Sequence, residues 1–539
     1  MKTLIALISI LLAALLASAP ASAAEARSTD ATAACTALAN GVNAAKFGMI
    51  PEAHTTVLTA AILPAHRDIP ETCRVEGVIA PTVGFLLYLP TRDWNGKFMM
   101  VGCGGACGAF LPFRIEPPLV RRYAVVATDL GHKGGPANFS FAYNNLLGVI
   151  DFGYRATHVT AVAAKELVAA YYSRAAARNY FMGCSTGGRQ GLMEAQQFPT
   201  DFEGIIAGAP PLDETGDSAY HLNWIMRSNV GTDNKPILTA DRLPLIHDAV
   251  LAACDARDGL KDGVLQDPRA CTWDPGAIAC NDGASTAACL SAAEVTVVRK
   301  IYSGATTSSG KALYFGMPRG SEDQWSMLIN IGNPPGSGAI GDSLMRNGAF
   351  FDFPGANYSV MDFDYDRDPP RLAVMERLYS VLNPDLRKFK AAGGKLISFH
   401  GWNDNNIPGG AMVDYYDTAM RTMGGERATQ DFYRLFMLPS VNHCQYGLGG
   451  GEVDWITALE NWVEKGLAPD AVMAHHMLTE PYPLIPGEPW AQMARHPLPP
   501  GSFDRVRPVF AYPDVAGYSG KGDPNQPTSW AKAKRPPVK

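Results

Sequence analysis

The sequence feature that most constrains the fold is the glycine-rich segment 183–192, which reads Gly-Cys-Ser-Thr-Gly-Gly-Arg-Gln-Gly-Leu. Its first five residues match the G-x-S-x-G pattern, in which a serine, here Ser185, occupies a sharp turn between a strand and a helix. Residues 179–182 predict a short buried strand before this turn, and residues 186–198 predict a helix after it. The pattern alone is weak, because glycine and serine are common. From its context between a strand and a helix, we expect the Ser185 hydroxyl to stand above the sheet and to act as a nucleophile.

Strand-like and helical segments alternate around this turn. Buried strands are predicted at 85–89, 97–101, 123–127, 180–182 and 204–207, and a long helix at 154–172. Such alternation predicts an α/β fold whose sheet is covered by helices on both faces. The pattern is lost after residue 211 and resumes with strands at 394–399 and 432–438. We interpret 213–390 as a lid domain inserted into a catalytic domain made of 24–212 and 391–539, and we expect the proline- and glycine-rich tail beyond about 500 to run extended over the surface.

The first residues predict export. Lys2 precedes an apolar run at 4–16 and an Ala-Ser-Ala cleavage site at 21–23, which together are typical of a signal peptide spanning 1–23. An uncleaved N-terminal anchor is the alternative. Removing Lys2 changes the net charge from −6 to about −7, and this mild acidity argues against nucleic acid or an anionic membrane as a partner. We expect a secreted or periplasmic protein; the sequence does not give its oligomeric state.

A serine nucleophile needs a base and an acid that orients the base. In α/β-hydrolases the chain order is Ser, then Asp or Glu, then His, on loops after later strands. Asp404 and His443 have that order, and each lies five residues beyond the end of a predicted strand. His132 and His400 are rival bases, but one precedes the serine and the other precedes the acid. We therefore expect both of these rivals to be structural.

Ten cysteines in an exported chain predict up to five disulfides. Cys184 precedes the nucleophile and Cys444 follows the base, so a bridge between them would join the two catalytic loops across about 260 residues. Cys103 and Cys107 lie in a glycine-rich loop after the strand 97–101, and pairing between them is supported by elimination only. That loop is also placed to supply one N–H group of an oxyanion hole, with Thr186 supplying the other.

Residues 254–264 form an acidic loop with two glycine turns. Asp255, Asp258 and Asp262 are spaced by three and four residues, which suits a hard cation bound by carboxylate and carbonyl oxygens. The spacing resembles a calcium-binding loop, but the twelfth position carries no glutamate. On these residues alone, a solvated acidic turn explains the pattern equally well.

Taken together, these motifs resemble those of the tannase and feruloyl esterase family, which includes hydrolases of terephthalate monoesters. The resemblance runs from about residue 35 to 520. It is carried by Gly-Cys-Ser-Thr-Gly-Gly-Arg at 183–189, Thr-Asp-Leu-Gly-His at 128–132, Phe-Glu-Gly-Ile-Ile-Ala-Gly-Ala-Pro at 202–210, His-Gly-Trp-Asn-Asp ending at 404 and Asn-His-Cys at 442–444.

The resemblance implies an α/β-hydrolase core with a large inserted lid and a set of site residues. It implies the catalytic residues Ser185, Asp404 and His443, with oxyanion N–H groups from Gly105 and Thr186. It also implies structural Ca²⁺ held by the carboxylates of Asp255, Asp258 and Asp262 and by the carbonyls of Leu260 and Val264. The implied disulfides are Cys35–Cys73, Cys184–Cys444, Cys254–Cys271 and Cys280–Cys289.

The expected activity is hydrolysis of carboxylic esters of aromatic, phenolic acids such as feruloyl or galloyl esters. Ile407 stands where the terephthalate-monoester enzymes carry an aromatic residue, which favours phenolic esters over that alternative. Two other classes stay open: a non-catalytic calcium-dependent binding protein on a hydrolase scaffold, and a thiol redox protein built on Cys103 and Cys107. Trp325 is a candidate wall of the substrate pocket, although a place in the lid core is at least as compatible with its sequence context.

Overall fold

The computed structural model describes residues 30–281, 286–329, 337–478, 498 and 500–534. The predicted signal peptide, 1–23, lies outside the described residues. Within the described part of the chain, no helix combines the length and apolarity needed to span a bilayer.

A nine-stranded sheet forms the core, in the order β1-β2-β3-β5-β4-β6-β7-β8-β9. Its strands β1 to β3 pair antiparallel, β3 pairs antiparallel with β5, and the six strands from β5 to β9 in this order are parallel. The strand bounds are β1 Thr55–Leu63, β2 Thr72–Ile79, β3 Val83–Pro90, β4 Lys97–Val101, β5 Ala124–Thr128, β6 Arg178–Cys184, β7 Gly204–Gly208, β8 Lys395–Gly401 and β9 Tyr433–Leu438. The strands predicted from β3 onward are all present, whereas β1 and β2 were not anticipated.

Helices cover both faces of the sheet, as predicted. Their bounds are α2 Gly41–Phe47, α3 Pro112–Val120, α4 Leu146–Ile150, α5 Ala156–Tyr172, α6 Thr186–Gln197, α7 Glu214–Gly216, α8 Asn223–Ser228, α9 Leu243–Cys254, α10 Ala292–Ser303, α11 Ser326–Ile329, α12 Ser337–Asn347, α13 Pro369–Tyr379, α14 Arg387–Ala391, α15 Gly409–Thr422, α16 Glu426–Gln430 and α17 Trp455–Lys465. A π-helical turn, Asp151–Arg155, precedes α5.

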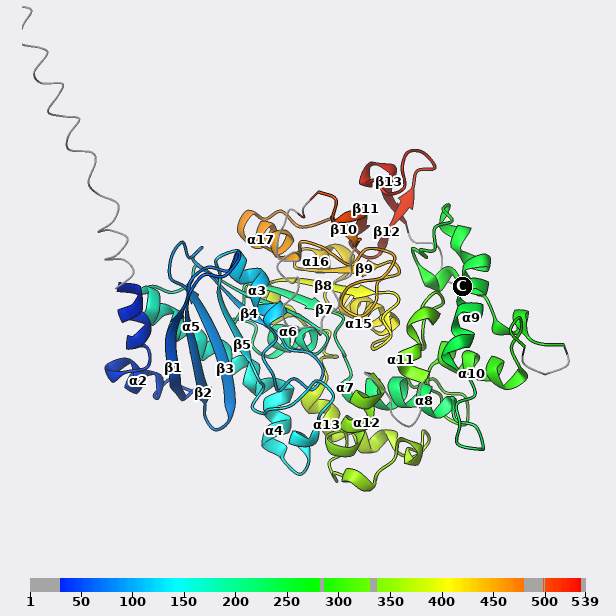
Figure 1. Cartoon of the computed structure of the whole chain (residues 1–539), viewed down its shortest axis with the longest axis horizontal. Helices are drawn as coiled ribbons and strands as arrows, with labels where there is room; N and C mark the ends of the chain where they lie inside the picture. The colour runs from blue at the N-terminus through cyan, green and yellow to red at the C-terminus, as the bar shows by residue number, and fades with distance from the viewer. Residues whose placement is uncertain (1–29, 282–285, 330–336, 479–497, 499, 535–539) are drawn as a thin grey trace, which may run out of the picture.

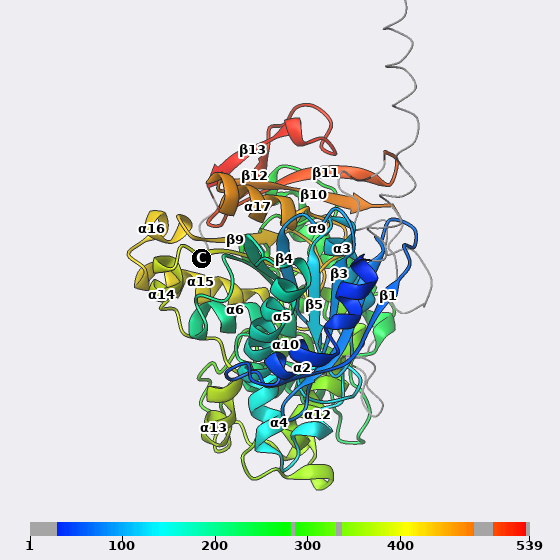
Figure 2. The ribbon, with the colours of Figure 1, turned by 90° about the vertical axis from the view of Figure 1, so that its left-hand side faces the viewer.

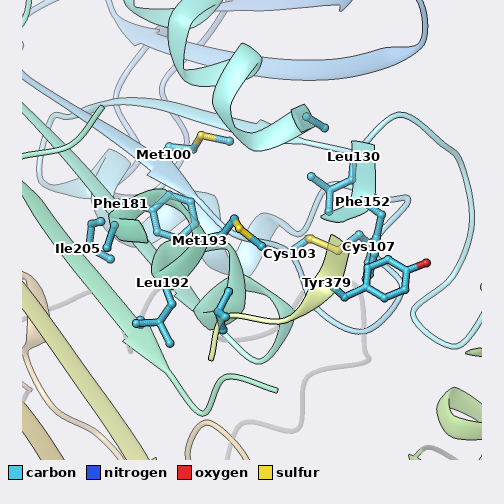
Figure 3. Close-up of a cluster of buried hydrophobic side chains, with 14 of the residues drawn as sticks. Met100, Cys103, Cys107, Leu130, Phe152, Phe181, Leu192, Met193, Ile205 and Tyr379 are labelled. Carbon is cyan, nitrogen blue, oxygen red and sulfur yellow. A yellow bond between two sulfur atoms is a disulfide. The ribbon is translucent and has the colours of Figure 1, made fainter. Parts of the chain in front are cut away.

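Successive residues of a strand point to opposite faces of a sheet, and β4 shows the result. Phe98 and Met100 enter the core shared with α5 and α6, whereas Met99 and Val101 enter the core shared with α3 and α17. Figure 3 shows the first of these cores, where side chains of β4, β6 and β7 meet those of α6. Because both faces are covered, the parallel strands carry apolar side chains on both faces, which made them recognisable in the sequence.

The segment between β7 and β8 carries helices α7 to α14 and extends to one side of the sheet (Figure 1). Because β7 and β8 are neighbours in the sheet, the chain leaves the core and re-enters it at adjacent strands. Part of the segment has its own apolar core, built by α8, α9, α10 and α11. Trp325 belongs to that core: it is fully buried, packs on Tyr302 and donates from its indole N–H to Ser321. It is therefore no wall of a pocket.

The tail beyond residue 500 is not simply extended over the surface. Strand β11, Phe503–Phe510, pairs with β10, Ala471–Met477, and β12, Asp514–Tyr518, pairs with β13, Trp530–Lys534. In Figures 1 and 2 these two hairpins lie at the opposite end of the molecule from α13. Val509 and Ala511 enter the core beside α17, so the tail completes the fold.

Candidate active site

The turn predicted at Ser185 joins β6 directly to α6. Ser185 has φ 64° and ψ −131°, a conformation that L-residues rarely adopt and that is typical of a strained nucleophile turn. The glycines on either side are required by close packing. A Cβ at Gly183 would lie 2.5 Å from the carbonyl carbon of Gly187, and one at Gly187 would lie 2.9 Å from the carbonyl oxygen of Cys103. The G-x-S-x-G pattern therefore reflects backbone contacts within the turn and with a neighbouring loop.

Asp404 and His443 meet beyond the ends of β8 and β9. Nδ1 of His443 lies 2.8 Å from Oδ2 of Asp404, and an ionised carboxylate can only accept, so the imidazole N–H donates. Oδ1 of Asp404 accepts the backbone N–H groups of Asn406 and Ile407 at 2.8 and 3.0 Å. The carboxylate is fully buried, whereas the His443 side chain keeps 18% of its surface exposed. The structure thus pairs a fixed acid with an accessible imidazole.

The pKa of the Asp404 carboxyl reflects two opposed effects. Burial alone would raise it, but His443 and His400 together hold it well below its usual range. Nε2 of His400 lies 3.2 Å from Oδ2 of Asp404 and 2.9 Å from the carbonyl oxygen of Ile407. Asp404 is therefore ionised at neutral pH and able to orient His443.

The two rival histidines are committed to structural contacts. His400 is fully buried under the acid loop. His132 stacks on Phe141 with ring centroids 3.6 Å apart, and its Nε2 lies 2.8 Å from the carbonyl oxygen of Ala106. Of the three histidines, only His443 both contacts Asp404 and keeps its imidazole accessible.

All ten cysteines are paired. The disulfides are Cys35–Cys73, Cys103–Cys107, Cys184–Cys444, Cys254–Cys271 and Cys280–Cys289. The four pairs implied by family resemblance are all present, and so is the local pair reached by elimination. The Cys184–Cys444 bridge brings the loops of Ser185 and His443 together, with 5.9 Å between the two Cα atoms.

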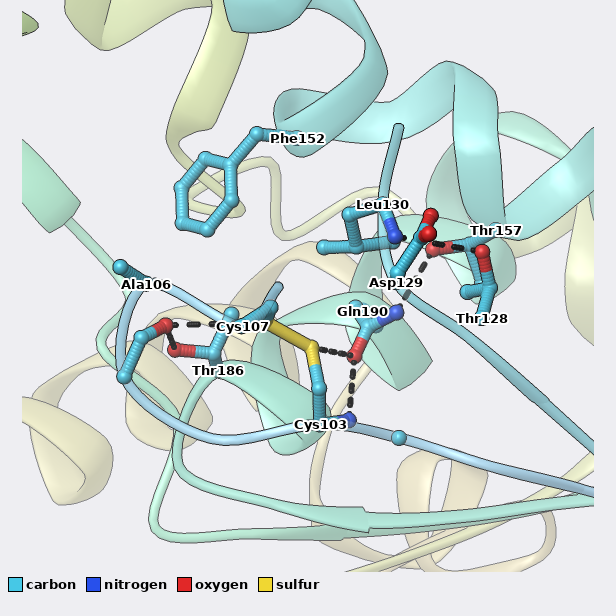
Figure 4. The surroundings of a disulfide bond; sticks show 12 residues. Cys103, Ala106, Cys107, Thr128, Asp129, Leu130, Phe152, Thr157, Thr186 and Gln190 are labelled. Carbon is cyan, nitrogen blue, oxygen red and sulfur yellow. Dashed lines mark hydrogen bonds between the residues drawn. A yellow bond between two sulfur atoms is a disulfide. The ribbon is translucent and has the colours of Figure 1, made fainter. Parts of the chain in front are cut away.

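The glycine-rich loop after β4 packs against the nucleophile turn. The N–H of Gly187 donates to the carbonyl of Cys103 at 3.0 Å. The hydroxyl of Thr186, labelled in Figure 4, donates to the carbonyl of Gly105 at 2.6 Å. Among the described residues, the backbone N–H groups of Gly105 and Thr186 donate to no protein acceptor. The two residues proposed from the sequence as oxyanion donors are therefore in contact, and their N–H groups are uncommitted among the described residues.

The segment between β7 and β8 contacts the loop that carries Asp404 directly. The side-chain amide of Asn403 donates to the carbonyl of Gly320 at 2.7 Å, and Nε2 of the buried His221 lies 3.2 Å from the carbonyl oxygen of Asn405. Because both contacts flank Asp404, the position of this segment and that of the candidate catalytic acid are coupled.

Arg189 ends the Gly-Gly-Arg motif, and no role for it was predicted from the sequence. Arg189 is fully buried and donates to the carbonyls of Phe152, Gly153 and Tyr379. Its Nε lies 3.2 Å from Oε2 of Glu214, the first residue of α7. One guanidinium therefore ties α6 to the π-helical turn, to the C-terminal residue of α13 and to the first residue of α7. The signal in the sequence was its place in the glycine-rich segment 183–192, directly after the candidate nucleophile turn.

The acidic loop 254–264 has features that fit a cation. Oδ1 of the buried Asp255 has no hydrogen-bond partner, and burial together with Asp262 and Asp255 raises the pKa of Asp258 to about 6. Both observations indicate negative charge that the protein compensates incompletely. Arg507 of β11 forms an ion pair with Asp262, which supplies part of the compensation. No choice of one oxygen atom each from Asp255, Asp258 and Asp262 brings all three atoms within 4.8 Å of one another.

A second carboxylate cluster lies away from the candidate catalytic residues, where His158, Glu194 and Asp201 place one ligand-type atom each within 4.8 Å of the others. Nδ1 of His158 is only 2.6 Å from Oδ2 of Asp201. That is a hydrogen-bond distance, shorter than the separation of two ligands about 2 Å from one metal ion in tetrahedral geometry. Glu194 is fully buried, and burial raises the pKa of its carboxyl well above the ordinary value. We interpret this cluster as a structural contact between α5 and the segment after α6, in which His158 and Asp201 share a hydrogen bond.

Comparison with known proteins identifies the family. The family model described as tannase and feruloyl esterase matches residues 67–533. The chain belongs to this family. Tannases and feruloyl esterases are carboxylic ester hydrolases, and the α/β-hydrolase fold predicted from the sequence is the fold of their solved structures.

Three relatives place the chain within the tannase and feruloyl esterase family. It is 32% identical to the mono(2-hydroxyethyl) terephthalate hydrolase of Piscinibacter sakaiensis, over 94% of this chain and 92% of that protein. It is 29% identical to a probable feruloyl esterase B-2 of Aspergillus flavus, over 72% and 75% of the two chains. The crystal structure of feruloyl esterase B from Aspergillus oryzae superposes with a TM-score of 0.78 at 26% identity, covering 93% of this chain and all of that one.

Proposed function

We propose that this chain is an exported serine esterase that hydrolyses carboxylic esters of aromatic acids, with Ser185, His443 and Asp404 as its catalytic triad. The observation that carries the proposal is the 2.8 Å hydrogen bond from His443 to the buried Asp404, on a loop bonded through Cys444 to the residue that precedes Ser185. The predicted leader at 1–23 and the five disulfides support export to an oxidising compartment.

The reaction follows from the donor and acceptor states of these groups. His443 keeps its Nδ1 proton in a hydrogen bond to Asp404, so its unprotonated Nε2 can take the Ser185 proton as the serine oxygen attacks the ester carbonyl. The resulting tetrahedral intermediate collapses when the C–O bond to the alcohol breaks, and His443 returns the proton to the leaving oxygen. Water then repeats the sequence on the acyl-enzyme and releases the acid.

The oxyanion needs two donors beside the nucleophile. The N–H groups of Gly105 and Thr186 have no protein acceptor among the described residues and belong to segments joined by the Thr186 hydroxyl. Donors fixed before the reaction stabilise charge that develops in the transition state, and removing one typically costs about 10²–10³ in kcat. We assign both N–H groups to the oxyanion hole.

Phenolic-acid esters, such as feruloyl and galloyl esters, are the substrates we favour, in keeping with the feruloyl esterases among the relatives. Ile407, in the acid loop, is aliphatic where an aromatic residue would suit a terephthalate ring. The second candidate is a terephthalate monoester, and the similarity to the Piscinibacter hydrolase across nearly the whole chain favours it. Relative kcat/KM values for methyl ferulate, methyl gallate and mono(2-hydroxyethyl) terephthalate would rank the three.

We also propose a structural Ca²⁺ at the acidic loop of the lid. Its ligands would be the carboxylates of Asp255, Asp258 and Asp262 and the carbonyls of Leu260 and Val264. The unpartnered Oδ1 of Asp255 and the raised pKa of Asp258 support a cation there. Bound Ca²⁺ would neutralise the loop and hold it in place, and it takes no part in the chemistry.

The decisive experiment compares wild type with Ser185→Ala on methyl ferulate and on a chromogenic aryl ester. We expect kcat to fall at least about 10³-fold in Ser185→Ala. Ser308→Ala, at an exposed lid serine, is the matched control and should keep wild-type activity. Native-rate hydrolysis by Ser185→Ala would refute the triad. No hydrolysis of any aryl ester by wild type would instead favour the non-catalytic binding protein.

A further inference from the structure

The disulfide Cys103–Cys107 has no part in the triad, yet it encloses Gly105. The bridge closes a ring of five residues in the loop after β4. Figure 4 shows it packed between the nucleophile helix and the loop that follows β5. A bond across so short a stretch removes little entropy from the unfolded chain, so its main effect is on local geometry.

One end of the ring is attached to the nucleophile helix. The N–H of Cys103 donates to Oε1 of Gln190 at 3.0 Å, and the carbonyl of Cys103 accepts the N–H of Gly187 at 3.0 Å. The Gln190 side chain is itself anchored, because its amide donates to Thr157 of α5 at 2.8 Å. Cys103 therefore moves with the turn that carries Ser185.

The other end of the ring holds the peptide that carries the Gly105 N–H. The N–H of Cys107 donates to the carbonyl of Gly104 at 3.0 Å. In a planar trans peptide the carbonyl and the N–H point in opposite directions, so fixing the Gly104 oxygen also fixes the direction of the Gly105 N–H. Cys107 adopts φ 64°, which a non-glycine residue seldom holds without support from its surroundings.

Gly105 has little room to adjust. Its φ is +57°, and a Cβ at this position would lie 2.1 Å from the carbonyl oxygen of Pro136. The neighbouring Ala106 N–H donates to the same oxygen at 2.7 Å. The backbone of Gly105 thus packs against the loop that carries Pro136. The disulfide between Cys107 and Cys103 connects it to the nucleophile helix.

We propose that Cys103 and Cys107 are positioning residues for the oxyanion hole: their disulfide aligns the Gly105 N–H with the Ser185 turn. The inference rests on the proposed esterase function and extends it to two residues that the triad does not use. A donor aligned in this way acts mainly in the transition state, because only there is the carbonyl oxygen fully charged. Loss of the bridge should therefore lower kcat and leave KM nearly unchanged.

The test is the double variant Cys103→Ser/Cys107→Ser, with Cys280→Ser/Cys289→Ser as the control that removes a short lid disulfide. Wild type is first mapped by peptide mass spectrometry under non-reducing conditions, where a Cys103–Cys107 cross-link is expected. For the double variant on an aryl ester we expect kcat to fall about 10- to 100-fold and KM to stay within about 3-fold. The control should keep both constants within about 2-fold.

An aryl boronic acid separates alignment from general damage, because it forms a tetrahedral adduct with the serine, whereas the aromatic acid product does not. In the double variant, the inhibition constant of the boronate should rise by the same factor by which kcat falls. The inhibition constant of the aromatic acid product should stay at its wild-type value. The proposal is overturned by free thiols at 103 and 107 in native protein, by a kcat within 2-fold of wild type, or by a kcat loss without weaker boronate binding. Failure of wild type to hydrolyse esters would refute the proposed function instead.

Discussion

Cys184 and Cys444 are bonded to each other although 260 residues separate them, and each stands directly beside a residue of the candidate triad. The disulfide thereby links the turn after β6, which carries Ser185, to the loop after β9, which carries His443. Displacing a catalytic group by about 1 Å can cost on the order of 10²-fold in rate. For Cys184→Ser/Cys444→Ser we therefore expect a loss in kcat of that size and a loss of about 2–5 kcal/mol in the free energy of unfolding. Aryl-ester kinetics and urea unfolding measure the two effects.

The matched control for this bridge is Cys280→Ser/Cys289→Ser, whose cysteines are only 9 residues apart in the lid. We expect near-native kcat and a smaller loss of stability for this control, because a short loop removes less unfolded-state entropy. Equal kcat losses in the two double variants would contradict a positional role for Cys184–Cys444.

Two adjacent glycines in the oxyanion loop give a sharper comparison. A Cβ at Gly105 would meet the Pro136 oxygen at 2.1 Å and would force alanine into φ +57°, whereas a Cβ at Gly104 would meet only the flexible end of Arg114 at 3.3 Å. We expect Gly105→Ala to lower kcat by about 10²-fold or more and Gly104→Ala to keep most of it. If the two alanine variants have similar kcat values, the Gly105 N–H is not an oxyanion donor.

Asp404→Asn tests the acid without removing the side chain. The amide can offer its N–H₂ to Nδ1 of His443 and thereby stabilise the wrong tautomer, so we expect kcat to fall at least about 10²-fold. KM should change little, because Asp404 is buried beneath His443. Asp414→Asn, at an exposed position of α15, is the control. Near-native kcat in Asp404→Asn would assign the orienting role elsewhere.

The sequence was sufficient for the parts of the fold in which local signals and burial agree. Strands β4, β6 and β7 are apolar on both faces, so they were visible as uninterrupted runs, and the glycines around Ser185 marked the turn between β6 and α6. Asp404 and His443 were found because each follows such a strand. Functional residues of such sheets lie beyond the carboxyl ends of the strands, so recognising the strands was enough to find the candidate residues.

Elements whose stability comes from distant partners were missed. Strand β1 is mostly exposed and lacks a clean alternation, so only its pairing with β2 identifies it. Strand β11 was hidden by the glycine- and proline-rich composition around it, yet it pairs with β10 and sends Arg507 to Asp262 across 245 residues. Trp325 could have lined a pocket or a core, and only tertiary packing decided between them.

Calcium removal should act on stability before it acts on chemistry. With Ca²⁺ at 100 times its Kd, binding to the folded state adds about 2.7 kcal/mol to the free energy of unfolding. We therefore expect a chelator to lower the Tm of wild type, and restored Ca²⁺ to raise it again. Asp258→Asn should lose most of this response. Asp248→Asn, at an exposed position of α9, should keep it. An unchanged Tm in wild type with and without chelator would argue against the site.

Glu214 makes the junction between lid and core sensitive to pH. Burial raises the pKa of its carboxyl to about 7, with Asp213 adding to the effect and Arg189 opposing it. Between the unperturbed value of 4.5 and about 7, the folded protein retains a proton that the unfolded chain releases. The contribution of this group to the free energy of unfolding is therefore complete below pH 4.5 and is lost as the pH rises towards 7.

Glu214→Gln isolates this effect, because glutamine resembles the protonated carboxyl and does not titrate. We expect the unfolding free energy of wild type, relative to that of Glu214→Gln, to fall by up to about 3 kcal/mol between pH 4.5 and pH 8. Urea unfolding at a series of pH values measures the difference. Glu426→Gln, at an exposed position of α16, should follow wild type throughout. Parallel pH curves for wild type and Glu214→Gln would show that the pKa of Glu214 is not raised in the folded protein.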